Sequence, residues 1–191
     1  MRLPILILAA LPLMASQPQL SPTESAVVRL LNEARTAPAR FAQRYLAPLA
    51  HESREAAECL REMSRMAPVP ALSVAAPLVQ SARDHAESSG AAGITGHQGA
   101  DGSTLNQRIS RYADWEGSIS ENLYYGRDDA EEIVVQLLID RGVTGRGHRR
   151  NILNAKMAAA GVAVRRHPSY GFICVMDFAT LLRPLQERRA R

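Results

Sequence analysis

The stretch GVAVRRHPSYGFICVMDFA, residues 161–179, decides the fold class. Residues 161–166 and 170–179 are rich in β-branched, aromatic and small apolar side chains, and His167-Pro168-Ser169 lies between them. Two such runs joined by a short turn-forming segment are typical of an antiparallel hairpin. The sequence therefore predicts that the chain ends in strands.

The residues before this hairpin follow helical periodicity instead. Ser21 to Glu24 reads as a capping box with Pro22 at the first helical position, and apolar residues follow at helical spacing. We expect further helices at these places: from Pro38, over 52–66, over 73–89 with Gly90 as its end, after Ser103, and from Asp128 or Asp129 to Gly142. Because helices come first and strands last, we predict an α+β fold with helices packed on a small antiparallel sheet.

Composition and charge limit the classes of function. The 191 residues are 46% hydrophobic and 22% charged, which is typical of one globular domain. The formal net charge is +4, but the basic residues are scattered among acidic ones, and no zinc-finger, homeodomain or RNA-binding motif is present. We therefore expect no nucleic-acid partner. We also expect the protein to be a monomer.

The first residues are typical of an export signal. Arg2 precedes an apolar run over 3–14, and the small residues Ala15 and Ser16 follow. This run is shorter than the about 20 apolar residues that span a bilayer, but it suits a signal peptide. We predict a signal peptide over 1–16 and a secreted or periplasmic protein without a transmembrane span in the mature chain. An uncleaved N-terminal anchor is the alternative, because Leu13 and Met14 are large for a cleavage site.

The mature chain is predicted to consist of one folded domain over 22–182 and a basic tail over 183–191. It contains two cysteines, Cys59 and Cys174. In an oxidising compartment these two residues are candidates for a disulfide. Two separate packed thiols are the alternative, since Cys59 lies in an amphipathic helical stretch and Cys174 in an apolar strand.

The histidines differ in their surroundings. His51 and His167 lie in predicted loops and are expected at the surface, whereas His85 lies on the apolar side of its helix and is expected to be packed and hydrogen-bonded. His97, in GHQGADG, and His148, in GRGHRRN, lie beside glycines. Because glycine lets a backbone bend and present an imidazole to a groove, these two are the candidate functional histidines.

Six motifs, in this order, resemble the CAP superfamily of cysteine-rich secretory, antigen 5 and pathogenesis-related proteins, particularly its secreted bacterial branch. The motifs are LLNEAR at 30–35, SARDHA at 81–86, GHQGADGSTLNQR at 96–108, SENLYYG at 120–126, GHRRNILN at 147–154 and GVAV at 161–164. The resemblance covers residues 27–179. It implies an α-β-α sandwich with a shallow cleft where two histidines and two acidic residues meet.

The resemblance maps these cleft residues onto His97, His148, Glu121 and Asp140. The last departs from the family pattern, because Leu137 to Asp140 stands where the family has Trp-x-x-Glu. In the family such a constellation can bind a divalent metal, and His97, His148 and Glu121 would be the ligands of a Zn²⁺ ion with water in the fourth position. A hydrogen-bonded polar cluster that orients loops is the alternative.

The leading functional interpretation is a secreted, non-enzymatic CAP-type module that binds a small apolar ligand or an envelope component. The runner-up is a metal-dependent hydrolase of an extracellular or envelope substrate. The sequence has neither an HExxH nor a GxSxG motif, and Ser120, beside Glu121, is the best available nucleophile. A structural envelope protein that acts through its surface alone is the third possibility.

Overall fold

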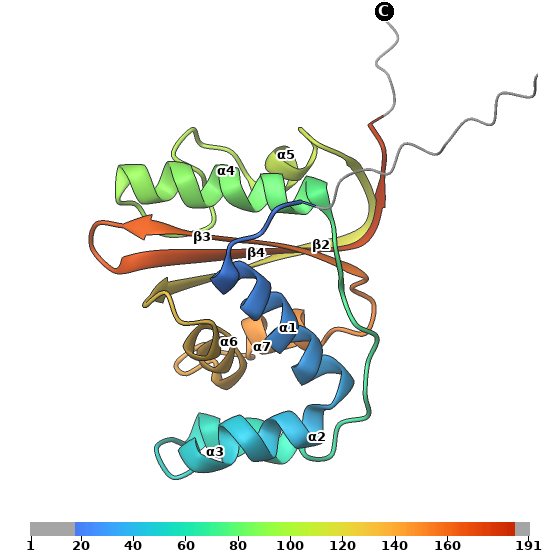
Figure 1. Ribbon diagram of the computed structural model, residues 1–191, viewed down its shortest axis with the longest axis vertical. Helices are drawn as coiled ribbons and strands as arrows, with labels where there is room; N and C mark the ends of the chain where they lie inside the picture. Colours follow the sequence, from blue (N-terminus) through green and yellow to red (C-terminus); the bar gives the residue numbers. More distant parts are fainter. Residues whose placement is uncertain (1–17, 186–191) are drawn as a thin grey trace, which may run out of the picture.

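A four-stranded sheet forms the middle layer of the computed structural model, which describes residues 18–185 (Figure 1). Its strands are β1 (Ser73–Val74), β2 (Asp114–Gly126), β3 (Ala159–His167) and β4 (Gly171–Arg183). The strand order is β1-β3-β4-β2; β4 pairs antiparallel with both neighbours, and the short β1 runs parallel to β3. Strand β2 therefore lies at an edge of the sheet.

The hairpin predicted over 161–179 is confirmed and is longer than expected. His167 pairs with Gly171 at the turn, and the register continues to Ala159 opposite Ala179. Gly171 has a φ of 85°, a conformation that costs glycine little and other residues more. Together with the helices on both faces, this confirms the α+β class and the α-β-α sandwich.

Helices α4 (Ala76–Ala92) and α5 (Leu105–Ile109) form the layer above the sheet in Figure 1. Glycines let α4 lie unusually close to β3: a Cβ on Gly161 would lie 2.1 Å from the carbonyl carbon of Leu78, and one on Gly90 would lie 2.3 Å from the carbonyl oxygen of Arg166. The prediction that Gly90 ends this helix was wrong. The helix continues to Gly93, whose φ of 65° forms the left-handed C-cap.

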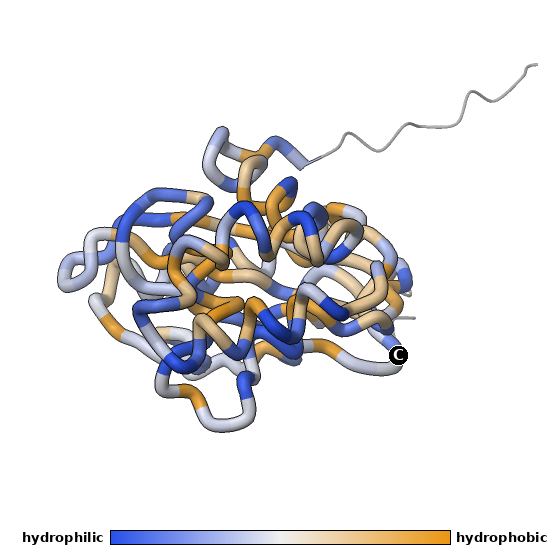
Figure 2. Tube along the Cα trace, turned by 90° about the horizontal axis from the view of Figure 1, so that it is seen from below, coloured by the Kyte–Doolittle hydropathy of each residue, from blue (hydrophilic) through white to orange (hydrophobic). Residues whose placement is uncertain are grey.

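The opposite face of the sheet is covered by α1 (Pro22–Thr36), α6 (Ala130–Ile139) and α7 (Gly147–Leu153) (Figure 1). A further group lies beyond them: α2 (Pro38–Phe41), η1 (Ala42–Leu46), η2 (Ala47–Leu49) and α3 (Arg54–Met63). The largest cluster of buried apolar side chains joins these helices to the sheet. Hydrophobic and hydrophilic residues alternate along the helices in Figure 2, as expected for helices that bury one side.

The start of α1 agrees with the sequence. The Ser21 hydroxyl accepts a hydrogen bond from the Glu24 amide at 3.1 Å, and the Glu24 carboxylate accepts one from the Ser21 amide at 2.8 Å. Near the other end of this helix, Arg35 is fully buried and donates to four carbonyl groups, those of Pro70, Ile152, Asn154 and Met157. These bonds tie α1 to two connecting segments distant in sequence.

Several predicted boundaries were wrong by one or two residues. Thr104, not Ser103, caps α5, because its side chain accepts the Gln107 amide. Asp129 caps α6, which ends at Asp140 in a left-handed conformation rather than at Gly142. The predicted signal peptide lies outside the described residues. Strand β4 extends through Arg183, where the basic tail was expected to begin, and residues 186–191 of that tail are not described.

Both cysteines are free thiols, so the candidate disulfide is not formed. Cys59 lies in α3 and Cys174 in β4, and both are buried in the same apolar cluster. The Cys59 Sγ lies 3.7 Å from the Met63 Sδ, one helical turn further on. This is the arrangement of the alternative considered above, two separate packed cysteines. Within residues 18–185, no helix has the length and apolar character needed to cross a membrane.

Candidate functional site

The first half of the site is centred on Glu121 in β2. Its carboxylate accepts a hydrogen bond from His97 Nδ1 at 2.8 Å and one from the Arg108 guanidinium at 2.5 Å. Arg108, in α5, also donates to the carbonyls of Ser103 and His97, at 2.8 and 3.2 Å. A buried arginine thus holds both the carboxylate and the loop that carries His97.

The electrostatics of this pair follow from burial and partners. Burial raises the pKa of Glu121, but the hydrogen bond from His97 and the positive charge of Arg108 outweigh it and lower the pKa below its usual range. The hydrogen bond to Glu121 raises the pKa of His97, against the smaller effects of partial burial and Arg108. Glu121 is therefore a carboxylate at neutral pH, and it favours the protonated form of His97.

A second acidic side chain lies behind Glu121. Asp177 in β4 is opposite Glu121 in the strand register, is fully buried, and accepts a 2.6 Å hydrogen bond from Ser81 Oγ. Burial, together with the negative charge of Glu121, raises the pKa of Asp177 well above its usual range. A neutral Asp177 carries an O–H group that can donate to the Glu121 carboxylate.

The second half of the site is formed by Asp140 and His148. Asp140 Oδ1 lies 2.7 Å from His148 Nδ1, and Oδ2 accepts the backbone amide of His148 at 2.9 Å. Asp140 has a φ of 55°, a left-handed conformation that aspartate tolerates better than most residues. Because this bend ends α6 beside the first turn of α7, the short aspartate side chain reaches the histidine.

Two asparagines connect the halves. The Asn122 side chain donates to the His148 carbonyl at 3.0 Å, and Asn151 donates to the Asn122 side chain at 2.8 Å. Glu121 and Asn122 are neighbours in β2, so their side chains point to opposite faces of the sheet. His97 is consequently on the α4 and α5 side of this edge strand, and His148 is on the α6 and α7 side.

Charged residues of α3 support the second half. Arg149 is buried, donates to the carbonyls of Leu138 and Ile139 at the end of α6, and pairs with Glu58 and Glu62 at 3.0 and 2.6 Å. The hydrogen bond from Arg146 is the main reason why the pKa of Glu58 falls to about 2. These contacts fix the junction from which Asp140 extends.

The four predicted residues thus form two carboxylate–imidazole pairs, His97 with Glu121 and His148 with Asp140, which we call the paired-histidine site. In each pair Nδ1 is engaged by a carboxylate, so Nε2 is the nitrogen left for a ligand. The His97 side chain is 61% exposed and that of His148 is 25% exposed. Both can be reached from solvent.

The zinc ligands expected from the sequence were His97, His148 and Glu121. Both oxygens of Glu121 are engaged by His97 and Arg108. Among residues 18–185, no three or more His, Cys, Asp or Glu side chains are grouped so that they could hold a metal ion. The arrangement therefore does not fit a three-ligand zinc site, and zinc binding stays a prediction.

Comparison with known proteins assigns the family. Residues 28–178 match the family described as CAP: Cysteine-rich secretory protein family. The chain belongs to the CAP family. No curated protein matches the chain.

Three solved structures resemble this CAP domain. A cysteine-rich secretory protein from Staphylococcus aureus matches with a TM-score of 0.51 and 13% identity, covering 83% of this chain and 38% of that one. An outer surface protein from Borrelia burgdorferi matches with a TM-score of 0.50 and 19% identity, covering 74% and 94%. An extracellular protein containing an SCP domain from Bacillus anthracis matches with a TM-score of 0.48 and 20% identity, covering 59% and 35%. This chain thus spans little more than a third of the Staphylococcus and Bacillus proteins.

The other histidines and Ser120 complete the comparison with the sequence. His85 is buried as expected, with hydrogen bonds to the Gly96 carbonyl and to Ser89, and burial lowers its pKa. The prediction for His167 was wrong: it is buried, with Nε2 3.1 Å from the Ile94 carbonyl oxygen and its ring against Tyr125 and Tyr170. Ser120 Oγ is buried without a hydrogen-bonding partner among the described residues.

Sequence reasoning missed three polar partners in the CAP site, Arg108, Asp177 and Asn122. Arg108 and Asn122 lie inside family motifs, so the motifs contain a signal for them. Asp177 stands in the apolar run FICVMDF, where a single carboxylate in a buried strand was itself the signal. Its partner could not be named, because the pairing depends on the register between β2 and β4.

Proposed function

We propose that this CAP domain is a secreted binding module that recognises a small ligand or an envelope component through the outer nitrogens of His97 and His148. The observation that carries the proposal is that both carboxylates of the paired-histidine site are engaged internally. Glu121 is held by Arg108 and His97, and Asp140 by the side chain and amide of His148. Such carboxylates orient imidazoles for binding.

The same observation disfavours the alternative, a metal-dependent hydrolase. A general base must lie within hydrogen-bond reach of the proton that it removes, and a nucleophile needs an activating base beside it. The Glu121 carboxylate is tied to a buried arginine, and the hydroxyl of Ser120 is buried with no hydrogen-bonded base among the described residues. The geometry therefore supports binding more than turnover.

Export is supported by the N-terminal sequence and by the structural resemblance to an outer surface protein from Borrelia burgdorferi. A protein outside the cytoplasm encounters envelope components, which is why we name these as the ligand class. The apolar ligand expected from the family resemblance remains part of the proposal.

Zn²⁺ is the probe that tests the site. Because Glu121 is already engaged by Arg108 and His97, we expect calorimetric titration at pH 7.5 to give at most weak uptake of about one ion per chain through the two histidines. This uptake should be lost in His97→Ala and His148→Ala and retained in His51→Ala, a substitution at the surface. Affinity should fall as pH drops, because the nitrogen ligands must be unprotonated. Because the pKa of His97 is raised, protonation of His97 should begin to weaken zinc binding already above about pH 6.5.

Hydrolysis assays on the same proteins separate the two functions. We expect no turnover of ester, peptide or glycan substrates above the buffer rate, with or without zinc. Turnover by the wild type that disappears in both histidine variants would establish the hydrolase instead. Zinc uptake by His148→Ala equal to that of the wild type would show that the paired histidines do not form one binding site.

A further inference from the structure

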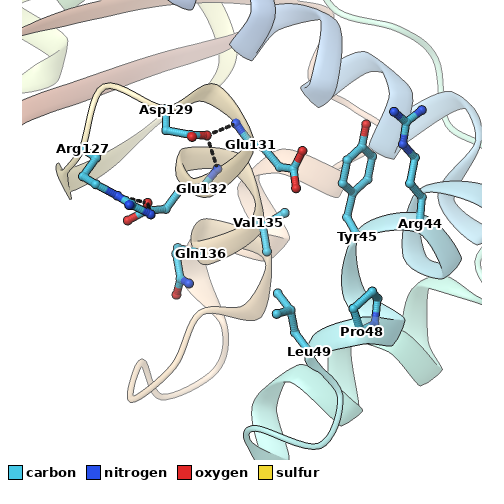
Figure 3. Close-up of a pocket in the computed structure, with 10 residues that line it drawn as sticks. All are labelled: Arg44, Tyr45, Pro48, Leu49, Arg127, Asp129, Glu131, Glu132, Val135 and Gln136. Atoms are coloured by element: carbon cyan, nitrogen blue, oxygen red, sulfur yellow. Dashed lines mark hydrogen bonds and ion pairs between the residues drawn. The ribbon is translucent and has the colours of Figure 1, made fainter.

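A groove lies between α1, η1 and α6, away from the paired-histidine site (Figure 3). It consists of two hollows, of about 530 and 450 Å³, that share Arg44, Tyr45, Asp129 and Glu131 along their walls. One hollow continues past Pro22 and Arg29 of α1, and the other past Leu49 and Gln136. No residue of either hollow belongs to the paired-histidine site.

The two walls of the groove carry opposite charges that face each other unpaired. Arg29 and Arg44 stand on the α1 and η1 side, and Asp128 and Glu131 on the α6 side. None of these four side chains forms an ion pair with another residue in the described part of the chain. The Glu131 carboxylate points across the groove towards Tyr45 in Figure 3. By contrast, nearby Arg127 is already paired with Glu132.

The groove also has apolar and neutral polar surface. Pro48, Leu49 and Val135 contribute apolar side chains. The Tyr45 ring packs on Phe41, with ring centroids 4.6 Å apart, and the Arg44 guanidinium lies 5.0 Å from the centroid of the Tyr45 ring. The Tyr45 hydroxyl forms no hydrogen bond within residues 18–185, so it is free for a ligand.

We propose that this groove binds a short extended peptide that carries both an acidic and a basic side chain. Ligands of a single charge sign, such as a nucleic acid or an acidic glycan, would be repelled by one of the two walls. A peptide with both signs can pair with Arg44 and Glu131 together, place an apolar side chain on Leu49 and Val135, and offer backbone groups to Tyr45. Each hollow has a volume in the usual range for ligand sites.

A library of N-acetylated, C-amidated hexapeptides on beads, probed with the labelled protein, tests the proposal. The wild type should select peptides that contain at least one acidic and one basic residue. With a resynthesised selected peptide, Arg44→Glu and Glu131→Arg should each weaken binding about 10-fold, the scale of a lost charge pair. The double variant Arg44→Glu/Glu131→Arg places like charges opposite both peptide side chains, so it should bind the selected peptide no better than either single variant and should prefer a peptide in which the acidic and basic residues are exchanged.

Surface variants at other sites control for net charge. Arg61→Glu and Glu52→Arg make the same charge changes on exposed residues outside the groove, and we expect each to bind like the wild type. Selection of peptides without paired charges would overturn the proposal, and so would binding by both single groove variants as tight as that of the wild type. A third result would also overturn the proposal: the wild type binds phosphatidylcholine vesicles but no library peptide, and both single groove variants abolish the vesicle binding. The ligand would then be a zwitterionic lipid surface.

Discussion

Glu121 shows how one buried side chain can set the state of its neighbours. It is 7% exposed, and its negative charge is held by Arg108 and shared through a hydrogen bond with His97. On the neighbouring strand β4, Asp177 is kept neutral by its burial and by the same negative charge. A buried charge is retained only when it is paired and hydrogen-bonded, and these neighbours provide both.

The protonation of His97 depends on its hydrogen bond to Glu121. Because the hydrogen bond to Glu121 raises its pKa, His97 should hold its proton to a higher pH than a free imidazole, whose pKa is about 6.5. The stabilisation from this pair is then complete below about pH 6.5 and is lost as pH rises through the pKa of the folded protein. Histidine NMR titration measures the pKa of His97. A midpoint for His97 at or below about pH 6.5, the value of a free imidazole, would contradict the assignment.

The protonation of buried Asp177 makes the stability of the fold depend on pH. Because its pKa in the folded protein is raised above the unfolded value of about 3.9, the free energy of unfolding should fall as pH rises between those two values. Asp177→Asn keeps an acceptor for Ser81 and a donor for Glu121 but removes this titration. The free energy of unfolding of Asp177→Asn minus that of the wild type should therefore increase by about 1 kcal/mol or more between pH 5 and pH 8.

Urea unfolding of both proteins at the two pH values measures this difference. Asp128→Asn, a substitution of an exposed aspartate, is the control for the loss of one carboxyl group at the surface. If the free energies of unfolding of Asp177→Asn and the wild type differ by the same amount at pH 5 and pH 8, then the pKa of Asp177 is not raised by folding.

At the scale of elements, the contact between α4 and β3 requires glycine. The Cβ of alanine at 161 would lie 2.1 Å from the Leu78 carbonyl carbon, so α4 would have to move away from the sheet. We expect Gly161→Ala to lower the free energy of unfolding by about 3 kcal/mol, the upper end for overpacking. Gly147→Ala is the control, since no atom lies within 4 Å of its added Cβ; it should be neutral or stabilise α7 by up to about 1 kcal/mol. Equal effects of the two substitutions in urea unfolding would contradict this account.

The sequence predicted elements best where the signal is local. The start of α1 is specified by Ser21 and Glu24 alone, and the hairpin by two apolar runs and a turn. No strand was predicted at the position of β2, because Glu121 and Asn122 are polar residues that point into the site and interrupt the apolar pattern. The end of α6 was misplaced because Asp140, rather than a glycine, adopts the left-handed conformation.

The site shows the same limit at a larger scale. The motifs pointed to His97, Glu121, Asp140 and His148, and the structure brings them together as two pairs. That the pairs flank the edge strand β2, with Asn122 between them, depends on strand order and register. These are properties of the whole sheet, so they could not be obtained from the spacing of residues along the chain.

At the scale of the whole molecule, the layers account for the state of the cysteines. Cys59 belongs to the outermost helical group and Cys174 to the sheet, and both are buried in the core between them. Burial raises the pKa of Cys59 to about 12 and also raises that of Cys174. Because the thiolate is the reactive form, both thiols should be inert in the folded protein.

The burial of both thiols predicts how they react in the folded and unfolded protein. Ellman's reagent should find no reactive thiol in the folded protein within minutes and two per chain after unfolding in guanidinium chloride. Reductant should leave the melting temperature unchanged, since a disulfide between these residues would contribute about 2 to 4 kcal/mol and its loss would lower the midpoint by several degrees. Cys59→Ala should destabilise the protein equally with and without reductant, because it removes a buried sulfur atom rather than a disulfide. Unfolded protein with no free thiol, together with a midpoint that reductant lowers, would instead mean that α3 and β4 approach closely enough in solution to be bridged.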